Sequence, residues 1–217
     1  MDKFRTKTSK VRETVVDSKE NKKEQILKVA SIVFAKHGFN KTTLDDIGEQ
    51  VGMKKNSLYH YFENKEDIFL EIIGMDAEEY FNNLEKELAG EINSSEKLKR
   101  FVLVTTGFWK EKANFYNLVT SVKIEMVNRI SDFYDVSITK QKMLINNILA
   151  EGVRSDEFVD HDTMQLAEDL IDMFVSIERL EFNRQKKSYF NEDYFNENKR
   201  KKMNLLNLIV KGLKKTK

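Results

Sequence analysis

The side chains best suited to chemistry stand together between Lys54 and His60, in the run KKNSLYH. Lysine, asparagine, serine, tyrosine and histidine offer hydrogen-bond donors to phosphates and base edges, and an α-helix fits the major groove of DNA. A helix that opens on two lysines carries positive charge at its positive end and lacks the usual Ser, Thr, Asp or Asn cap. The sequence breaks a local rule here, which points to a functional surface.

A short helix is predicted just before this surface. Thr42 and Thr43, followed by two aspartates, are typical of a helix start. Apolar residues then repeat at three- and four-residue steps up to Val51. Gly52 follows, where a left-handed residue ends a helix at little cost.

A second helix is predicted at about 54–61 after a tight turn, which makes the segment a helix-turn-helix. Leu58, Tyr61 and Phe62 share its buried face. From geometry, lysine favours guanine acceptors and asparagine favours adenine, so we expect base contacts from Lys55 and Asn56. A solvated basic face on a helical hairpin is the alternative. The predicted DNA-binding residues are Thr43, Lys54, Lys55, Asn56, Ser57, Tyr59, His60, Tyr61 and Lys65.

The run from Lys22 to about Ile73 resembles the DNA-binding region of the tetracycline-repressor (TetR) family of transcriptional regulators. Two positions depart from the family pattern: Lys54 stands where members usually carry a capping serine, and Asn56 where they carry glycine. The base preference therefore does not transfer from a relative. The positions that carry the resemblance are His37, Gly38, Phe39, Thr42, Thr43, Ile47, Leu58, Tyr59, Tyr61, Phe62, Asn64, Lys65 and Glu66.

Composition favours an all-α fold. The 217 residues include no proline and 8 glycines, which favours long helices. There is no cysteine, hence no disulfide, which leaves the redox compartment open. No apolar run approaches a membrane span, and no apolar signal-peptide core follows the charged first residues, so we expect a cytoplasmic protein. We predict three parts: a flexible basic arm over 1–21, a helix-turn-helix DNA-binding domain over 22–65, and a helical effector-binding and dimerisation domain over 66–217.

The resemblance implies a C-terminal helical domain, about nine helices in total, and a homodimer formed by the last two helices. We predict helices at about 66–87, 96–112, 114–130, 132–152, 163–185 and 191–214. The resemblance also implies an effector pocket among the helices of this domain. Its candidate lining is Phe108, Trp109, Tyr116, Met126, Arg129, Phe133 and Phe174, although aromatics and methionines at helical spacing are more often plain core.

Catalysis has little support in the sequence. His37, His60 and His161 form no pair at metal-binding spacing on one helix, and the glycines form no phosphate-binding cluster. No catalytic residue, metal or cofactor is predicted.

We expect a ligand-responsive regulator, most likely a repressor, that binds a pseudo-palindromic operator and is released by a small, largely apolar effector. The alternative is a dimeric helical scaffold or small-molecule-binding protein that does not recognise DNA sequence.

Overall fold

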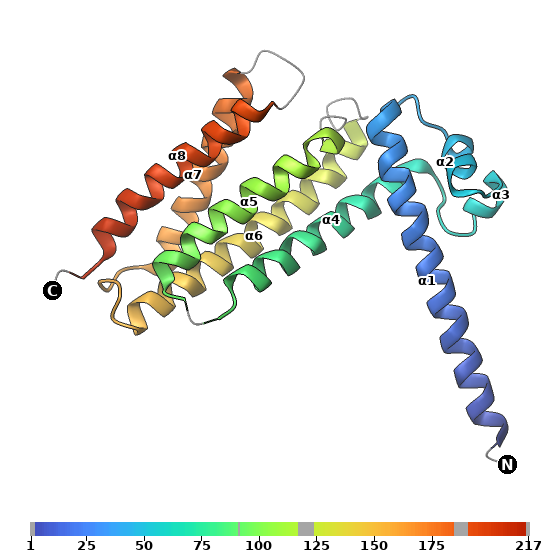
Figure 1. The fold of residues 1–217 in the computed structure, drawn as a ribbon, viewed down its shortest axis with the longest axis horizontal. Coiled ribbons are helices and arrows are strands. Elements are labelled where there is room, and N and C mark those ends of the chain that lie inside the picture. The colour runs from blue at the N-terminus through green and yellow to red at the C-terminus, as the bar shows by residue number, and fades with distance from the viewer. Residues whose placement is uncertain (1–2, 91, 117–123, 185–190, 216–217) are drawn as a thin grey trace. The chain divides into compact units, whose positions relative to one another are not determined.

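The structure is a computed structural model, and it describes residues 3–90, 92–116, 124–184 and 191–215; within these ranges the side chains of 3–18, 113–116 and 124–128 are outside the description. The described residues form eight helices and no strand, close to the nine helices expected, so the all-α prediction is confirmed (Figure 1). The helices are α1 (Lys3–His37), α2 (Leu44–Val51), α3 (Lys55–Leu58), α4 (Lys65–Leu88), α5 (Ser94–Tyr116), α6 (Ile124–Arg154), α7 (Thr163–Arg184) and α8 (Glu192–Leu213).

The chain divides into two compact units. Of the described residues, the first unit comprises 3–74 and 124–126, and the second comprises 75–116 and those from 127 onwards. The first unit therefore contains the predicted DNA-binding domain together with the first residues of α4.

Three phenylalanine rings form the centre of the first unit. Phe34 of α1 lies 5.3 Å from Phe39 in the following turn, and both rings contact Phe69 of α4, at 5.8 and 5.1 Å between ring centroids. All three side chains are fully buried. Edge-to-face and tilted ring pairs of this kind are stabilising beyond the apolar area that they bury. The cluster holds α1 and α4 together and so fixes the platform on which α2 and α3 pack.

Helix α1 begins at Lys3, whereas the sequence predicted a flexible arm over residues 1–21. The segment contains neither glycine nor proline and is rich in lysine, arginine and glutamate, which are good helix formers. Nothing therefore interrupts the helix at residue 22. Apolar residues are sparse in this segment.

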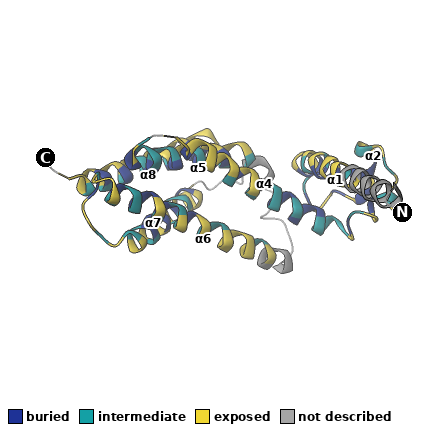
Figure 2. Cartoon of the chain, turned by 90° about the horizontal axis from the view of Figure 1, so that it is seen from below, coloured by how far each residue is buried: buried dark blue, intermediate teal, exposed yellow. Residues whose placement is uncertain are grey.

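The second unit is built from α5, α6, α7, α8 and the C-terminal part of α4. The dark faces in Figure 2 are the faces that these helices turn towards one another. Fully buried side chains from different helices meet there, among them Leu84, Phe101, Leu149, Leu170 and Leu206. This single apolar cluster positions the helices that line the cavity described below.

The predicted helix boundary near Ser131 is wrong, because α6 runs without a break from Ile124 to Arg154. Ser131 and Asp132 resemble a helix start, but they are also tolerated on an exposed helix face, and both are exposed. Beyond them, residues directed at the core, such as Ile138 and Ile145, repeat at helical spacing. Tertiary packing thus carries the helix through the two polar residues.

The loop before α7 fastens two other elements of the second unit. The Glu157 carboxylate accepts hydrogen bonds from the backbone nitrogens of Ser94 and Ser95, at 2.8 and 3.2 Å, and so caps α5. Phe158 is fully buried and forms an isolated antiparallel bridge with Lys214, just after α8. No helix in the described ranges has the length and hydropathy needed to cross a bilayer.

Candidate nucleic-acid interface and helical cavity

Helix α2 starts and ends as its sequence predicts. The Thr43 hydroxyl accepts from the Asp46 backbone nitrogen at 3.2 Å, and the Asp46 carboxylate accepts from the Thr43 backbone nitrogen at 2.7 Å, which completes a capping box. Hydrogen bonds from the Thr43 side chain and backbone lower the pKa of Asp46. At the other end, Gly52 takes a left-handed φ of 74°.

The Thr43 hydroxyl is also a donor, at 2.7 Å, to the same Asp46 carboxylate. Its task in the structure is to begin α2, although the residue remains exposed beside the predicted interface. A DNA contact from Thr43 stays a prediction.

Helix α3 begins without a side-chain cap. Lys54 occupies the N-cap position with φ −71° and ψ 147°, and no side-chain hydrogen bond satisfies the first helical nitrogens. Serine, threonine, aspartate or asparagine would normally do so. The positive end of this short helix therefore remains open, as the sequence indicated.

The helical part of α3 is shorter than the predicted 54–61. It ends at Leu58, and a turn continues it, in which Tyr61 and Phe62 donate their backbone nitrogens to the Leu58 carbonyl at 2.9 and 3.0 Å. Leu58 and Phe62 anchor the segment in the core with 0% and 3% exposure, while Tyr61 is half-buried. The side chains left exposed are Lys54, Asn56, Tyr59 and His60, with Lys55 and Ser57 partly exposed.

Two residues that the sequence analysis did not single out shape this surface. Asp45 of α2 accepts a hydrogen bond from the Lys55 ammonium at 3.0 Å, and this bond raises the pKa of Lys55. Gly48 lets the turn close on α2, since a Cβ there would lie 2.6 Å from the Met53 carbonyl oxygen. An aspartate in the first turn of a helix is so common a start signal that its second role could not be distinguished in the sequence.

Lys65 has a different role from the phosphate contact that was predicted. Its Nζ donates to the carbonyl oxygens of Phe39, Thr42 and Asn40 at 2.8, 2.9 and 3.4 Å, and lies 4.6 Å from the Phe39 ring centroid. An ammonium has three donors, and all three are in use. Lys65 thus ties the start of α4 to the loop between α1 and α2, and its contact with DNA stays a prediction.

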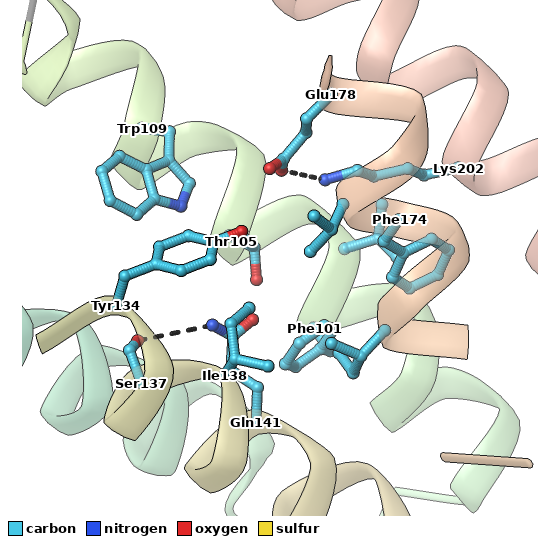
Figure 3. A pocket seen from close by; sticks show the side chains of 13 residues that line it. Phe101, Thr105, Trp109, Tyr134, Ser137, Ile138, Gln141, Phe174, Glu178 and Lys202 are labelled. Atoms are coloured by element: carbon cyan, nitrogen blue, oxygen red, sulfur yellow. Dashed lines mark hydrogen bonds and ion pairs between the residues drawn. The ribbon is translucent and has the colours of Figure 1, made fainter. Parts of the chain in front are cut away.

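A cavity lies within the second unit, between α5, α6, α7 and α8 (Figure 3). Its volume is about 30 Å³, which is enough for water. Two of the predicted effector residues, Trp109 and Phe174, lie in its wall. The lining consists of Phe101, Val102, Thr105, Trp109, Tyr134, Ser137, Ile138, Gln141, Ile171, Phe174, Val175, Glu178 and Lys202.

The other predicted effector residues are not brought to this cavity. Phe108 is 7% exposed and packs against Tyr80 in the core, with 5.1 Å between the ring centroids. Arg129 and Phe133 lie on the exposed part of α6, where an uninterrupted helix turns them away from the lining. The side chains of Tyr116 and Met126 fall outside the described part of the chain.

The cavity contains an ion pair that the sequence analysis missed. The Lys202 ammonium donates to the Glu178 carboxylate, and the lysine side chain is only 4% exposed. The signal was present, because Lys202 lies four residues before Leu206 and eight before Val210, on the buried face of α8. A lysine at a core position needs a partner, so this spacing predicts a buried acid nearby.

The fold and the site together define an all-helical protein with a helix-turn-helix. A model described as "Bacterial regulatory proteins, tetR family" matches residues 26–72. This match assigns residues 26–72 to the DNA-binding region of the TetR family of bacterial regulatory proteins. The fatty acid metabolism regulator protein of Bacillus subtilis is 26% identical over 150 residues, which cover 68% of this chain and 76% of that protein.

A second relative and a solved structure are also similar to this chain. The transcriptional regulator QacR of Staphylococcus aureus is 31% identical over 114 residues, which cover 52% of this chain and 54% of that protein. The crystal structure of a transcriptional regulator from Cytophaga hutchinsonii matches the fold with a TM-score of 0.77 at 23% identity, over 88% of this chain and 98% of that chain. The similarity in fold extends well beyond the helix-turn-helix.

Proposed function

We propose that the protein is a cytoplasmic, homodimeric repressor whose α3 binds the major groove of a pseudo-palindromic operator. The observation that carries this proposal is the open start of α3, where Lys54 leaves the first helical nitrogens without a side-chain cap. A phosphate oxygen supplies the missing acceptor and also suits the positive helix end. Exposed Asn56, Tyr59 and His60 follow on the same segment.

The proposed dimer forms through α7 and α8. Leu180 on α7 and Leu208 on α8 are 48% and 71% exposed, and half-buried Ile177 and Leu205 lie one turn before them. Exposed apolar side chains at this spacing favour packing against the same helices of a second copy. A two-fold dimer would set its two α3 segments about 34–36 Å apart, one turn of DNA.

The proposed regulation is a population shift driven by an effector in the cavity of the second unit. An effector that binds one conformation of the dimer better than the other changes DNA affinity by that difference. Apolar and aromatic side chains dominate the lining, which favours a largely apolar molecule. The relative from Bacillus subtilis bears the name of a fatty acid metabolism regulator, which agrees with an apolar chain as one part of the effector.

A DNA-binding titration with the duplex upstream of the protein's own gene tests this function. We expect binding that competitor DNA of scrambled sequence displaces poorly and that weakens steeply with salt, because phosphate contacts release counterions. The variant Lys55→Ala with Asn56→Ala should lose the preference for the specific duplex. Lys99→Ala, which removes one charge at a partly exposed position of α5, serves as the control. Equal affinity for specific and scrambled DNA would instead favour the helical scaffold.

A further inference from the structure

The charged pair in the cavity is unequally accessible. The Glu178 side chain is 33% exposed, against 4% for Lys202. In Figure 3, Lys202 lies on one side of the Glu178 carboxylate, and Trp109 and Tyr134 lie on the other. A molecule that enters the cavity therefore meets the carboxylate first, with the ammonium behind it.

Aromatic rings surround the accessible side of this carboxylate. Trp109 and Tyr134 line the same cavity as Glu178, and the Glu178 charge contributes, after burial, to raising the pKa of Tyr134 to about 12. Burial also raises the pKa values of Tyr80 and Tyr194, and the Glu178 charge adds to both shifts. The negative field of Glu178 thus reaches three tyrosines even though Lys202 is bound to it.

The ion pair between Glu178 and Lys202 favours binding of a cationic ligand over an anionic one. A carboxylate has about four lone-pair sites, so Glu178 can hold Lys202 and accept a second positive group. An anion could reach Lys202 only by displacing the Glu178 carboxylate, and it would meet that negative charge first. Aromatic faces next to a carboxylate add cation–π attraction for an ammonium group.

We propose that the effector is an amphiphile with one positively charged head, which binds Glu178 between Trp109 and Tyr134, and an apolar tail that lies against Phe101 and Phe174. This inference rests on the proposed function, since it assigns a chemical class to the effector of the same cavity. The volume of about 30 Å³ is too small for such a molecule, since pockets for ligands of that size have about 300–1,000 Å³. Tyr134, which is 42% exposed, can turn outward to make room.

Two probes with the same tail and opposite heads test the proposal: decyltrimethylammonium and decyl sulfate, both kept below their micelle-forming concentrations. Trp109 is the one tryptophan in the chain, so its fluorescence reports binding in this cavity directly. We expect saturable quenching or a spectral shift with the cation, at an affinity at least about tenfold above that for the sulfate. Equal affinities, or tighter binding of the sulfate, would overturn the proposal.

Variants of the ion pair identify the group responsible. Glu178→Gln should abolish the preference for the cation and strengthen binding of decyl sulfate, because Lys202 then lacks its partner. Glu178→Gln with Lys202→Met removes both charges and should bind the two probes equally; this double variant carries the test if the single one unfolds. Glu192→Gln removes a surface carboxylate that pairs with Lys110 and should leave the preference unchanged. Retained cation preference without Glu178 would contradict the assignment.

A DNA-binding measurement with the same probes separates this inference from the proposed function. If the protein binds its upstream duplex and decyl sulfate, but not decyltrimethylammonium, releases it, the regulator stands and the cationic effector is wrong. If the cation binds beside Trp109 but no specific DNA binding exists, the cavity assignment stands and the regulatory function fails.

Discussion

The Lys55 ammonium lies 3.0 Å from the Asp45 carboxylate, so an ion pair joins the first residue of α3 to the start of α2. Both side chains are substantially exposed, at 42% and 65%, and exposed pairs of this kind contribute little to stability. The pair instead sets where the lysine points and reduces the positive charge on the proposed DNA-binding surface.

Asp45→Asn should therefore tighten operator binding, because it removes a negative charge beside the phosphates and frees Lys55. We expect an affinity about three- to tenfold higher, or roughly 0.7–1.4 kcal/mol, in a fluorescence anisotropy titration at fixed salt. Glu49→Gln makes the same charge change at another exposed position of α2 and should have a smaller effect. Weaker binding by Asp45→Asn would mean that Asp45 orients Lys55 for its contact.

Lys65→Met should destabilise the first unit without a direct effect on DNA contacts. The substitution keeps the apolar stem and removes three hydrogen bonds to backbone carbonyls, whose loss we expect to cost about 2 kcal/mol. Chemical denaturation followed by circular dichroism measures the change. The matched variant Lys54→Met, on the exposed start of α3, should leave stability unchanged and weaken DNA binding, the reverse pattern.

Thr43→Ala should destabilise α2 by about 1 kcal/mol through loss of the N-cap and should also change the response to acid. Because hydrogen bonds from Thr43 hold the pKa of Asp46 below its ordinary value of 3.8, the folded state binds this proton less readily than the unfolded state. The resulting stabilisation is present above that pH and is lost as the pH falls through the folded pKa. Thermal unfolding between pH 2 and 6 should show a smaller acid-dependent loss in Thr43→Ala than in the parent, and identical slopes would refute the capping role.

Gly152→Ala should destabilise the second unit, whereas Gly107→Ala should not. A Cβ at residue 152 would overlap the buried Phe158 ring, and overpacking of this kind costs roughly 1–3 kcal/mol. At residue 107, an exposed position of α5, nothing lies within 4 Å of the new Cβ. Alanine there should raise the free energy of unfolding by about 0.5–1 kcal/mol. Differential scanning calorimetry should shift the two midpoints in opposite directions.

Leu208→Glu should convert the proposed dimer to a monomer and reduce operator affinity by at least about tenfold, equivalent to roughly 1.4 kcal/mol. The side chain is 71% exposed in the single subunit, so the fold should survive the new charge. Leu103→Glu, at a 46% exposed leucine of α5, is the matched control. Sedimentation velocity distinguishes the two, and an unchanged dimer in Leu208→Glu would place the interface elsewhere.

Local rules accounted for most of the first unit. The capping threonine, the left-handed Gly52 and the spacing of Leu58 and Phe62 each act within a few residues, so the sequence predicts α2 and the start of α3 correctly. The long reach of Lys65 to the loop before α2 has no local signal. The charge of Lys65 alone could not reveal these hydrogen bonds.

Prediction from sequence was weaker in the second unit, where the position of each side chain depends on contacts between helices that are far apart in the sequence. A rotation of a fraction of a helical turn decides whether an aromatic side chain lines a cavity or fills the core. Trp109 therefore lines the cavity, whereas its neighbour Phe108 does not. The partnership of Glu178 and Lys202 joins two helices. A charge on an apolar face was the one clue to it in the sequence.

Backbone hydrogen bonds connect the C-terminal end of α8 to the loop before α7. Besides the bridge between Phe158 and Lys214, the Val159 nitrogen donates to the Leu213 carbonyl at 2.8 Å and the Lys215 nitrogen donates to the Glu157 carbonyl at 3.3 Å. These bonds oppose any sliding of α8 along its axis. If an effector displaces α8, we therefore expect the end near Glu192 to move further than the end anchored at residue 214.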